Sequence, residues 1–286
     1  MGKLQTSANT IAMLHSILPS LSKAEQKVAT AVLENLNNTV YSSVTDLAEL
    51  AEVGETTVIR FCRKLGYRGF QEFKLALAQD LVSPNQQVHG KIEENDSASV
   101  VCQKITLYNT QALEDTVSLL QEDQLQKATD ALIRAKRQYF FGVGSSGMTA
   151  QDAQYRFMRL GFDAHCASDG HIIAMNCAMT TEEDVVFGIS TSGSTKDLVD
   201  AVRIAKENGA FVICLTNHAR SPVTSYADAI LLAAAKETPL QGGAFASKLA
   251  QIHVLDILST VVSMKQRTST FDALNRTAKS VLDKLY

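Results

Sequence analysis

Long hydrophobic runs are absent from this chain of 286 residues. No stretch approaches the roughly 18 consecutive apolar residues that a membrane-spanning helix needs. An apolar run at residues 11–18 is interrupted by His15 and Ser16, and it lacks the small-residue end of a secretory signal. We therefore expect a cytoplasmic protein with neither a signal peptide nor a membrane partner.

Closely spaced cysteines are also missing. The five cysteines form no Cys-x-x-Cys pair, and four of them lie inside apolar patterns, which is typical of small buried side chains in a reducing compartment. The spacing predicts neither a zinc site nor a disulfide framework. Nothing else in the sequence indicates a metal or another cofactor.

An excess of charge of one sign is missing as well. The chain has 27 basic and 30 acidic side chains, a formal net charge of −3, so a nucleic-acid site would have to be a local cluster. Hydrophobic residues make up 45% of the chain, which is typical of soluble globular proteins. The length suits one large domain or two ordinary ones.

A hydroxyl-rich turn follows the most strand-like stretch of the chain. Residues 185–189 form a short apolar run without alternating polar side chains, which predicts a strand buried on both faces. Residues 198–205 carry apolar side chains at helical spacing. The turn between them consists of Ser190, Thr191, Ser192, Gly193, Ser194 and Thr195.

Such a turn can bind an anion. The first turn of a helix has backbone N–H groups without intrahelical partners and the positive end of the helix dipole. Hydroxyl donors would surround a tetrahedral phosphate, and a glycine lets the backbone approach it. The alternative is an ordinary capped turn with one capping hydroxyl and the others solvated. The clustering favours phosphate, with these candidate ligands: Ser190, Ser192, Gly193, Ser194 and Thr195.

A second loop of this kind lies earlier in the chain. A predicted strand leads into a G-x-G-x-x-G run at residues 142–147 and then a helix, which matches the dinucleotide-binding fingerprint, and Asp169 could serve as the ribose-binding acid. However, Ser145 and Ser146 place hydroxyls in this loop, and a nucleotide does not require the second hydroxyl-rich turn. Two such loops at the ends of parallel strands favour one small phosphate ester, bound by Gly144, Ser145 and Ser146 on this side.

Strand and helix alternate in the second half of the chain, which predicts a doubly wound parallel sheet of the α/β class. The predicted strands are residues 138–143, 163–167, 185–189, 211–215 and 229–235, and the last predicted helices are 243–265 and 271–285. Residues 81–97 lose periodicity and collect polar residues, glycine and proline, as linkers do. We expect an all-α domain at 1–80, a linker at 81–97 and the α/β domain at 98–286.

The first eighty residues have a helix-turn-helix pattern. Ser22 and Ser43 each begin a capping box, which predicts two helix starts. The first helix is expected to end at Asn37 and Asn38. After the second, a tight turn at residues 52–54 leads into a helix with an apolar face and an opposite polar, basic face. The apolar face carries Val58, Phe61, Cys62 and Leu65.

Positive charge is concentrated near this last helix. Residues 59–74 hold five basic side chains and one acidic one, whereas residues 22–58 hold two and six. A basic helix face is often merely solvated, but in a helix-turn-helix it lies in the major groove. By position, Thr56, Thr57 and Arg60 would reach base edges, and Arg63, Lys64 and Arg68 would contact phosphates.

Both halves of the chain resemble known families. Residues 190–195 are similar to the Ser-x-Ser-Gly-x-Thr signature of sugar isomerase (SIS) domains, and the glycine loop resembles the opening SIS motif. Residues 57–74 resemble the helix-turn-helix motif of the RpiR family of bacterial transcriptional regulators. One departure is Gly54, where that family often has a serine before the recognition helix.

The resemblance implies a transcriptional regulator of sugar metabolism. Its SIS-type domain would bind a phosphorylated sugar, contacted also by Glu237, and the sugar would control binding to double-stranded operator DNA. Amino-sugar 6-phosphates, pentose phosphates and hexose phosphates all remain open as effectors. Self-association, as a homodimer or homotetramer, is implied as well, and the role is not enzymatic.

Two enzymatic alternatives remain. A sugar-phosphate isomerase would need a base such as Glu237 and a group that assists ring opening, such as His171 or His253. Each histidine lies in an apolar helical pattern, where a structural role is more common. The DNA-binding domain would be superfluous in an isomerase. A nucleotide-dependent redox enzyme would instead require tight NAD or NADP binding.

Overall fold

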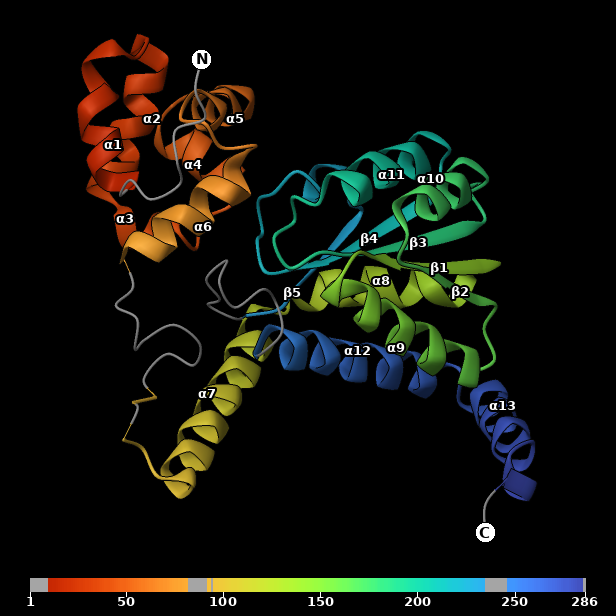
Figure 1. Cartoon of the computed structure of the whole chain (residues 1–286). Coiled ribbons are helices and arrows are strands. Elements are labelled where there is room, and N and C mark those ends of the chain that lie inside the picture. Colours follow the sequence, from red (N-terminus) through yellow and green to blue (C-terminus); the bar gives the residue numbers. More distant parts are fainter. Residues whose placement is uncertain (1–9, 82–91, 94, 235–245, 285–286) are drawn as a thin grey trace. The chain divides into compact units, whose positions relative to one another are not determined.

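The computed structural model describes residues 10–81, 92–93, 95–234 and 246–284 (Figure 1). The chain forms two compact units, which divide inside one long helix between Thr110 and Gln111. Glu237 lies outside the described residues, as does most of the predicted linker. Within the described ranges, no helix is both long and apolar enough to cross a membrane.

The first unit is helical, as predicted. Its helices up to residue 81 are α1 (Thr10–Ile17), α2 (Lys23–Glu34), α3 (Leu36–Thr39), α4 (Val44–Leu50), α5 (Glu55–Lys64) and α6 (Phe70–Leu81), with a 3-10 turn at Leu18–Ser20. Both capping boxes form: the Ser22 amide donates to Glu25 at 2.9 Å, and the Asp46 amide donates to Ser43 Oγ at 3.0 Å. α4, the turn after it and α5 make the helix-turn-helix.

The end of α2 differs from the prediction. The helix ends at Glu34 rather than at Asn37 and Asn38, because Asn35 leaves helical geometry with φ −133° and ψ 40°. The Asn35 side chain donates to the Ala31 carbonyl at 3.2 Å, so it competes with the backbone for that acceptor. Leu36 then begins the short α3 and packs against the core from there.

Lys74 is not part of a basic surface, although its charge belongs to the predicted cluster. Its side chain is buried, and its ammonium donates to the Ser42 carbonyl at 2.7 Å. Burial lowers the pKa of Lys74 to about 8. The ammonium therefore joins α6 to the turn before α4, and the exposed charge of the cluster comes from Arg60, Arg63, Lys64 and Arg68.

The core of the first unit confirms the predicted apolar face of α5. Val58, Phe61 and Cys62 are completely buried. The Phe61 ring meets Phe73 of α6 edge to face, with 5.9 Å between ring centroids. Because this face is packed against α6, the opposite face of α5, which begins with Thr56, points to solvent.

A buried carboxylate ties α5 to α2. Glu25 is 5% exposed. Its carboxylate accepts a hydrogen bond from Lys64 Nζ at 2.8 Å and lies 4.0 Å from Arg60 Nε. The hydrogen bond from Lys64, helped by the Ser22 amide, lowers the pKa of Glu25 to about 2. A buried carboxylate of this kind stays charged and holds the C-terminal end of α5 in place.

The second unit contains a five-stranded parallel sheet in the order β2-β1-β3-β4-β5. The strands are β1 (Arg137–Gly142), β2 (Ala164–Ala167), β3 (Asp184–Ile189), β4 (Phe211–Thr216) and β5 (Ala229–Leu232). All five were predicted within a few residues. β5 ends before the predicted 229–235, because the Ala234 amide donates to Thr116 Oγ1 of a helix rather than to a strand.

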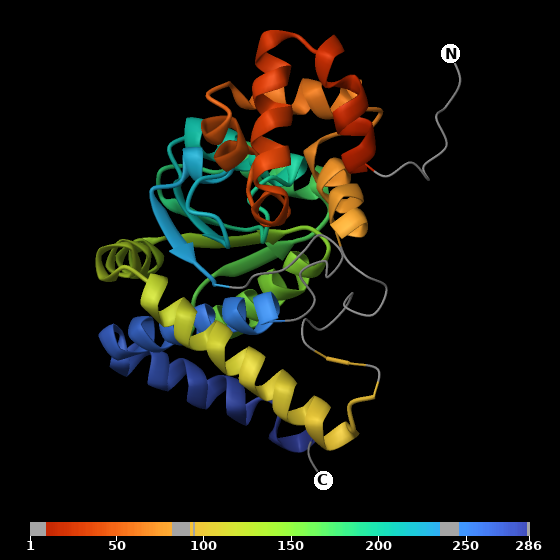
Figure 2. The ribbon, with the colours of Figure 1, turned by 90° about the vertical axis from the view of Figure 1, so that its left-hand side faces the viewer.

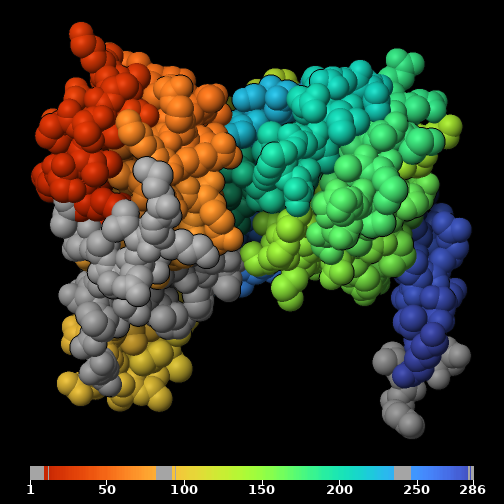
Figure 3. Space-filling model, turned by 45° about the horizontal axis from the view of Figure 1, so that its top comes forward, coloured from red at the N-terminus to blue at the C-terminus, as the bar shows by residue number. Residues whose placement is uncertain are grey.

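Helices cover both faces of the sheet (Figures 1 and 2). One face packs against α8 (Glu122–Arg134), α9 (Ser145–Arg159) and α12 (Ala246–Lys265), and the other against α10 (Gly170–Ala178) and α11 (Lys196–Glu207). In the space-filling view, α10 and α11 form the green and cyan surface (Figure 3). The predicted doubly wound α/β fold is therefore confirmed.

Two further helices complete the chain. α7 (Ala98–Leu119) buries Ala112 and Thr116, while Leu107 is 70% exposed and Val117 54%. α13 (Arg267–Lys279) begins four residues before the predicted helix, because Gln266 interrupts α12 with φ −111° and ψ 34°. The sequence predicts both segments as helices, but it does not predict that they expose apolar side chains.

Four of the five cysteines were expected to be buried, and the structure agrees only in part. Cys62, Cys177 and Cys214 are buried, and burial raises the pKa of each thiol to about 12. Cys102 and Cys166 are exposed. Cys166 is exposed because β2 is an edge strand of the sheet, so three rather than four cysteines are buried side chains.

Replacing Glu25 with glutamine should destabilise the first unit by about 1–3 kcal/mol near neutral pH, because the charge-assisted hydrogen bond from Lys64 is lost. The folded pKa of Glu25 lies below its ordinary value of 4.5. Wild-type protein therefore has this stabilisation above about pH 5 and loses it as the pH falls toward 2. Urea-dependent pulsed hydrogen exchange, read in peptides of α2 and α5, measures the loss.

The Glu25→Gln protein should show a smaller loss of stability between pH 5 and pH 3 than the wild type. Glu52→Gln is the matched control, because Glu52 pairs with Lys27 on the surface, with a side chain 80% exposed, and such pairs contribute little. Identical pH profiles for wild type and Glu25→Gln would contradict the assignment.

Candidate functional site

The two predicted loops leave neighbouring strands at the same edge of the sheet. β1 and β3 pair in parallel, with Gly142 opposite Ile189 at their carboxyl ends. From this pair the chain turns outward in opposite directions, to β2 on one side and to β4 on the other. In open α/β sheets, ligands bind in the crevice outside such a switch point. The structure thus brings the loop after β1 and the loop after β3 together, as predicted.

The β3–α11 loop is a tight turn that only glycine fits. The Gly193 amide donates to the Ser190 carbonyl at 3.1 Å, and Gly193 has φ +63°. A Cβ at this position would lie 2.1 Å from Ser221 Oγ. Because both the backbone angle and the space exclude a side chain, Gly193 determines the path of the loop.

The hydroxyls of this loop lie at different depths. Ser190 is 2% exposed, and its Oγ lies 3.2 Å from Thr195 Oγ1. Thr195 is the N-cap of α11, next to the first-turn amides. The half-buried Ser192 and Ser194 are joined by a hydrogen bond from the Ser194 amide to Ser192 Oγ at 3.3 Å. The loop therefore presents hydroxyls and a helix N-terminus together.

The β1–α9 loop is shorter. Gly144 is the N-cap of α9 with φ +61° and ψ −128°, a conformation that favours glycine. Ser145 is half-buried and Ser146 is buried, and both are in the first turn of the helix. Their backbone amides belong to the group that has no acceptor within the helix. This loop contributes a second helix N-terminus to the crevice.

Helix α12 lies beside α9 and the β3–α11 loop and was not predicted as part of the site. Gln251 is 1% exposed, and its side chain joins α9 to the β3–α11 loop: it accepts from Thr149 Oγ1 of α9 and donates to Thr191 Oγ1 of the loop, both at 3.0 Å. Lys248 donates to Thr149 Oγ1 at 2.5 Å and to the Ser145 carbonyl. The signal available in the sequence was the pair of polar residues at i and i+3 in a largely apolar helix.

The dinucleotide alternative receives no support from Asp169. Its Oδ1 accepts hydrogen bonds from the amides of His171 and Ile172, each at 3.0 Å, and thereby caps α10. The carboxylate is therefore used within its own helix rather than held ready for a ribose. The strand order also differs from the 3-2-1-4-5-6 order of dinucleotide-binding sheets.

The isomerase alternative depends on Glu237, His171 and His253, of which the structure describes only the two histidines. His171 is exposed, contrary to a structural role, and His253 is half-buried. The predicted base, Glu237, lies outside the described residues. Among the described residues, no group of three or more His, Cys, Asp or Glu side chains is placed to hold a metal ion.

The DNA-binding candidates fall into two groups. Thr56, Arg60 and Arg63 are exposed at i, i+4 and i+7, on one face of α5. Lys64 is hydrogen-bonded to the buried Glu25, so it supports the helix as well as adding charge. Arg68 is 91% exposed and pairs with Glu72 at 3.2 Å, and Thr57 is half-buried.

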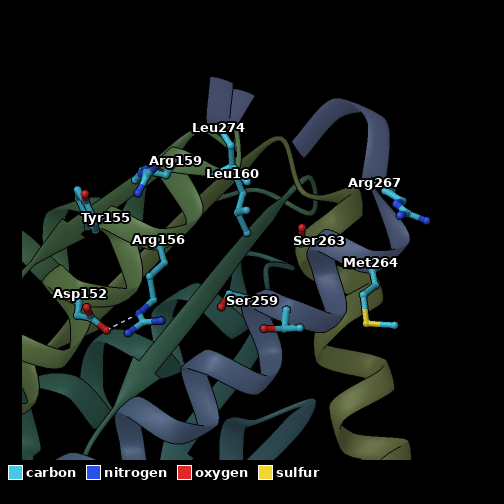
Figure 4. Close-up of a pocket in the computed structure, with 11 residues that line it drawn as sticks. Asp152, Tyr155, Arg156, Arg159, Leu160, Ser259, Ser263, Met264, Arg267 and Leu274 are labelled. Carbon is cyan, nitrogen blue, oxygen red and sulfur yellow. Dashed lines mark hydrogen bonds and ion pairs between the residues drawn. The ribbon is translucent and has the colours of Figure 1, made fainter. Parts of the chain in front are cut away.

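A groove of about 820 Å³ lies between α9, α12 and α13 (Figure 4). Arg156 lines this groove and pairs with Asp152 at 2.6 Å and with Asp256. The groove starts at Asp152, about 10 Å along α9 from its first residue. It is therefore a different surface from the crevice between the two loops.

Comparisons with known proteins agree with this architecture. A family model for the SIS domain matches residues 131–261, and a model described as a helix-turn-helix domain of the rpiR family matches residues 8–84. The structure of Vibrio vulnificus NanR complexed with ManNAc-6P is similar with a TM-score of 0.86 and 31% identity, over 97% of this chain and 99% of that chain.

Two relatives match this chain over nearly their whole length. An HTH-type transcriptional regulator of Haemophilus influenzae is 34% identical over 281 residues, 97% of this chain and 98% of the relative. The HTH-type transcriptional regulator HexR of Escherichia coli is 35% identical over 274 residues, 96% of this chain and 94% of HexR. With its helix-turn-helix, its SIS-type sheet and these matches along nearly its whole length, the chain belongs to the RpiR family of transcriptional regulators.

Proposed function

We propose that a phosphorylated sugar, bound between the β1–α9 and β3–α11 loops, controls the binding of this regulator to operator DNA. The observation that supports this proposal most directly is the convergence of two hydroxyl-bearing helix N-termini at the β1/β3 switch point. The proposed ligand contacts are Gly144, Ser145, Ser146, Ser190, Ser192, Gly193, Ser194, Thr195 and Glu237. The proposed DNA contacts are Thr56, Thr57, Arg60, Arg63, Lys64 and Arg68.

The domains follow from the same proposal. Residues 1–80 would bind DNA, residues 98–286 would bind the effector, and residues 81–97 would link these two domains. Since one helix-turn-helix reads one half-site of a two-fold operator, the regulator would act as a homodimer or homotetramer in the cytoplasm. The exposed apolar side chains of α7, Leu107 and Val117 among them, are suited to burial against a second copy.

The effector is proposed by class. NanR of V. vulnificus was solved with ManNAc-6P, so amino-sugar 6-phosphates come first among the candidates, followed by hexose and pentose phosphates. We propose a sensor rather than an enzyme, because the relatives are named as transcriptional regulators. An isomerase remains the second candidate, since the same SIS fold is found with sugar-phosphate isomerases.

A ligand panel combined with DNA retention tests the proposal. Full-length protein is mixed with sugar phosphates, and with NAD and NADP, in a thermal-shift assay, where a ligand at 100 times its Kd adds about 2.7 kcal/mol of stability. Operator duplexes are selected from a random pool. A bound sugar phosphate should change operator affinity by about 5–150-fold. Enzyme-like turnover of aldose or ketose phosphates, or tight binding of NAD or NADP alone, would refute the sensor.

Arg60→Ala combined with Arg63→Ala should abolish operator retention in a gel-shift assay. Each arginine contact contributes about 1–3 kcal/mol, so the double variant should bind at least tenfold more weakly. Arg276→Ala with Lys279→Ala is the control, because it removes the same charge from α13. Effector binding should persist in both double variants. Unchanged retention after the α5 substitutions would refute the recognition-helix assignment.

Ser192→Ala combined with Thr195→Val should weaken sugar-phosphate binding by about tenfold or more, because each lost hydrogen bond to a charged group costs about 1.5–3 kcal/mol. Calorimetric titration measures the change, and the melting temperature should stay close to that of the wild type. Thr268→Val with Ser269→Ala removes two exposed hydroxyls from α13 and serves as the control. Equal affinity in the loop variant would remove this loop from the site.

A further inference from the structure

Helix α5 begins with an acidic side chain. Glu55 is its first residue and its one acidic residue, beside the three basic residues Arg60, Arg63 and Lys64. An acid in the first turn stabilises the helix dipole, but a carboxylate near DNA is repelled by the phosphates. In a helix-turn-helix, the N-terminal residues of the second helix are the ones that contact base edges. Glu55 therefore lies where a carboxylate can meet a base.

The first helix of the motif holds this carboxylate. Thr45 Oγ1, in the first turn of α4, donates to Glu55 Oε1 at 2.5 Å, and both residues are half-buried. Within the described residues, the Glu55 side chain forms no other hydrogen bond or ion pair. An ionised carboxylate has two oxygens and about four acceptor positions. Thr45 can therefore orient Glu55 and leave acceptor positions for a base.

This orientation lowers the cost of reading a base. A free glutamate side chain loses rotamer entropy when a contact orders it. Because Thr45 already restricts Glu55 before DNA binds, less of that entropy remains to be lost on binding. The hydrogen bond joins the two helices of the motif, so the carboxylate keeps its place relative to both.

The four bases offer a carboxylate different partners in the major groove. Cytosine presents its N4 amino group as a donor, whereas guanine presents the acceptors N7 and O6 and thymine the acceptor O4. Adenine has the acceptor N7 beside its N6 amino group. Since an ionised carboxylate only accepts hydrogen bonds, it binds cytosine and is repelled by the acceptors of the other three bases.

We propose that Glu55 reads one cytosine in each half-site of the operator and that Thr45 holds Glu55 in position for this contact. The inference rests on the proposed function, because it requires that α5 lie in the major groove of an operator. It adds a specificity-determining residue to the proposed DNA contacts. The basic residues of α5 would supply affinity for any duplex, and Glu55 would supply discrimination between sequences.

The test selects operators from random duplexes with full-length protein. Wild-type protein should select a cytosine at one fixed position of each half-site, and replacing that base pair should weaken binding about tenfold, equivalent to about 1.4 kcal/mol. Glutamine donates as well as accepts, and it pairs with N6 and N7 of adenine. Glu55→Gln should therefore select adenine at this position and leave the other positions unchanged.

Binding to an unrelated duplex separates base reading from a structural role. If Glu55 only stabilised α5, its loss would weaken binding to every duplex. If Glu55 reads a base, Glu55→Ala should lose the cytosine preference and bind the unrelated duplex at least as tightly as wild type does, because a negative charge has left the DNA-facing surface. Fluorescence anisotropy titrations measure both affinities.

Variants of Thr45 test its positioning role. Thr45→Val removes the donor and should lose part of the cytosine preference, whereas Thr45→Ser keeps the donor and should retain the preference. Glu52→Gln is the matched control, because Glu52 lies just before α5, pairs with Lys27 and has a side chain 80% exposed. It should select the same sequence as the wild type.

The outcomes distinguish this inference from the proposed function. If wild-type protein selects an operator and Glu55→Gln selects the same bases with the same preference, reading by Glu55 is refuted while the regulator function stands. Wild-type sites without a cytosine at a fixed position refute it as well. If Glu55→Gln fails to fold, Glu55→Ala and Thr45→Val still decide the base preference. If wild-type protein selects no duplex, the proposed function and the inference are both refuted.

Discussion

The parallel pairing of β1 with β3 is the constraint on which the rest of the second unit depends. Parallel strands end at the same edge of a sheet, so the loops that follow them must be neighbours. The connections leave this pair in opposite directions, which opens a crevice between the loops. Each loop contains a glycine with positive φ shortly before its helix begins, Gly144 in one and Gly193 in the other. This arrangement places the hydroxyls of both loops at the same edge of the sheet. The same residues on a loop elsewhere would be ordinary caps.

Each proposed binding surface is backed by a buried polar side chain as well as by apolar packing. In the first unit, Glu25 holds Lys64 and lies near Arg60 behind the exposed face of α5. In the second unit, Gln251 joins Thr149 to the loop after β3. Buried polar groups are costly unless they are fully hydrogen-bonded, and a bonded one fixes geometry more sharply than apolar contacts do. Both proposed surfaces would need such geometry, because phosphate oxygens and base edges are recognised at hydrogen-bond distances.

Most of the fold follows from local patterns in the sequence. The apolar run at β3, the capping boxes and the alternation of strands and helices are all local signals, and the structure confirms them. The partners of Lys64 and Gln251 were not predictable in this way. Glu25 lies 39 residues from Lys64, and Thr149 lies 102 residues from Gln251. The pattern of each helix alone does not identify these partners. The pairing depends on how helices pack, which periodicity does not encode.

Control of DNA binding by a ligand requires that the ligand bind two conformations of the regulator with different affinity. α7 belongs to both compact units, since they divide within it. A series of hydrogen bonds joins the β3–α11 loop to the part of α7 that lies in the second unit. The Thr191 carbonyl accepts from the Asn217 amide, and the Thr216 carbonyl accepts from the Ala233 amide. The next amide, of Ala234, donates to Thr116 of α7. Under the proposed function, a ligand that moved the β3–α11 loop would act on residues one or two hydrogen bonds from α7. Tight binding alone would not regulate the protein, because a ligand with equal affinity for both conformations shifts neither population.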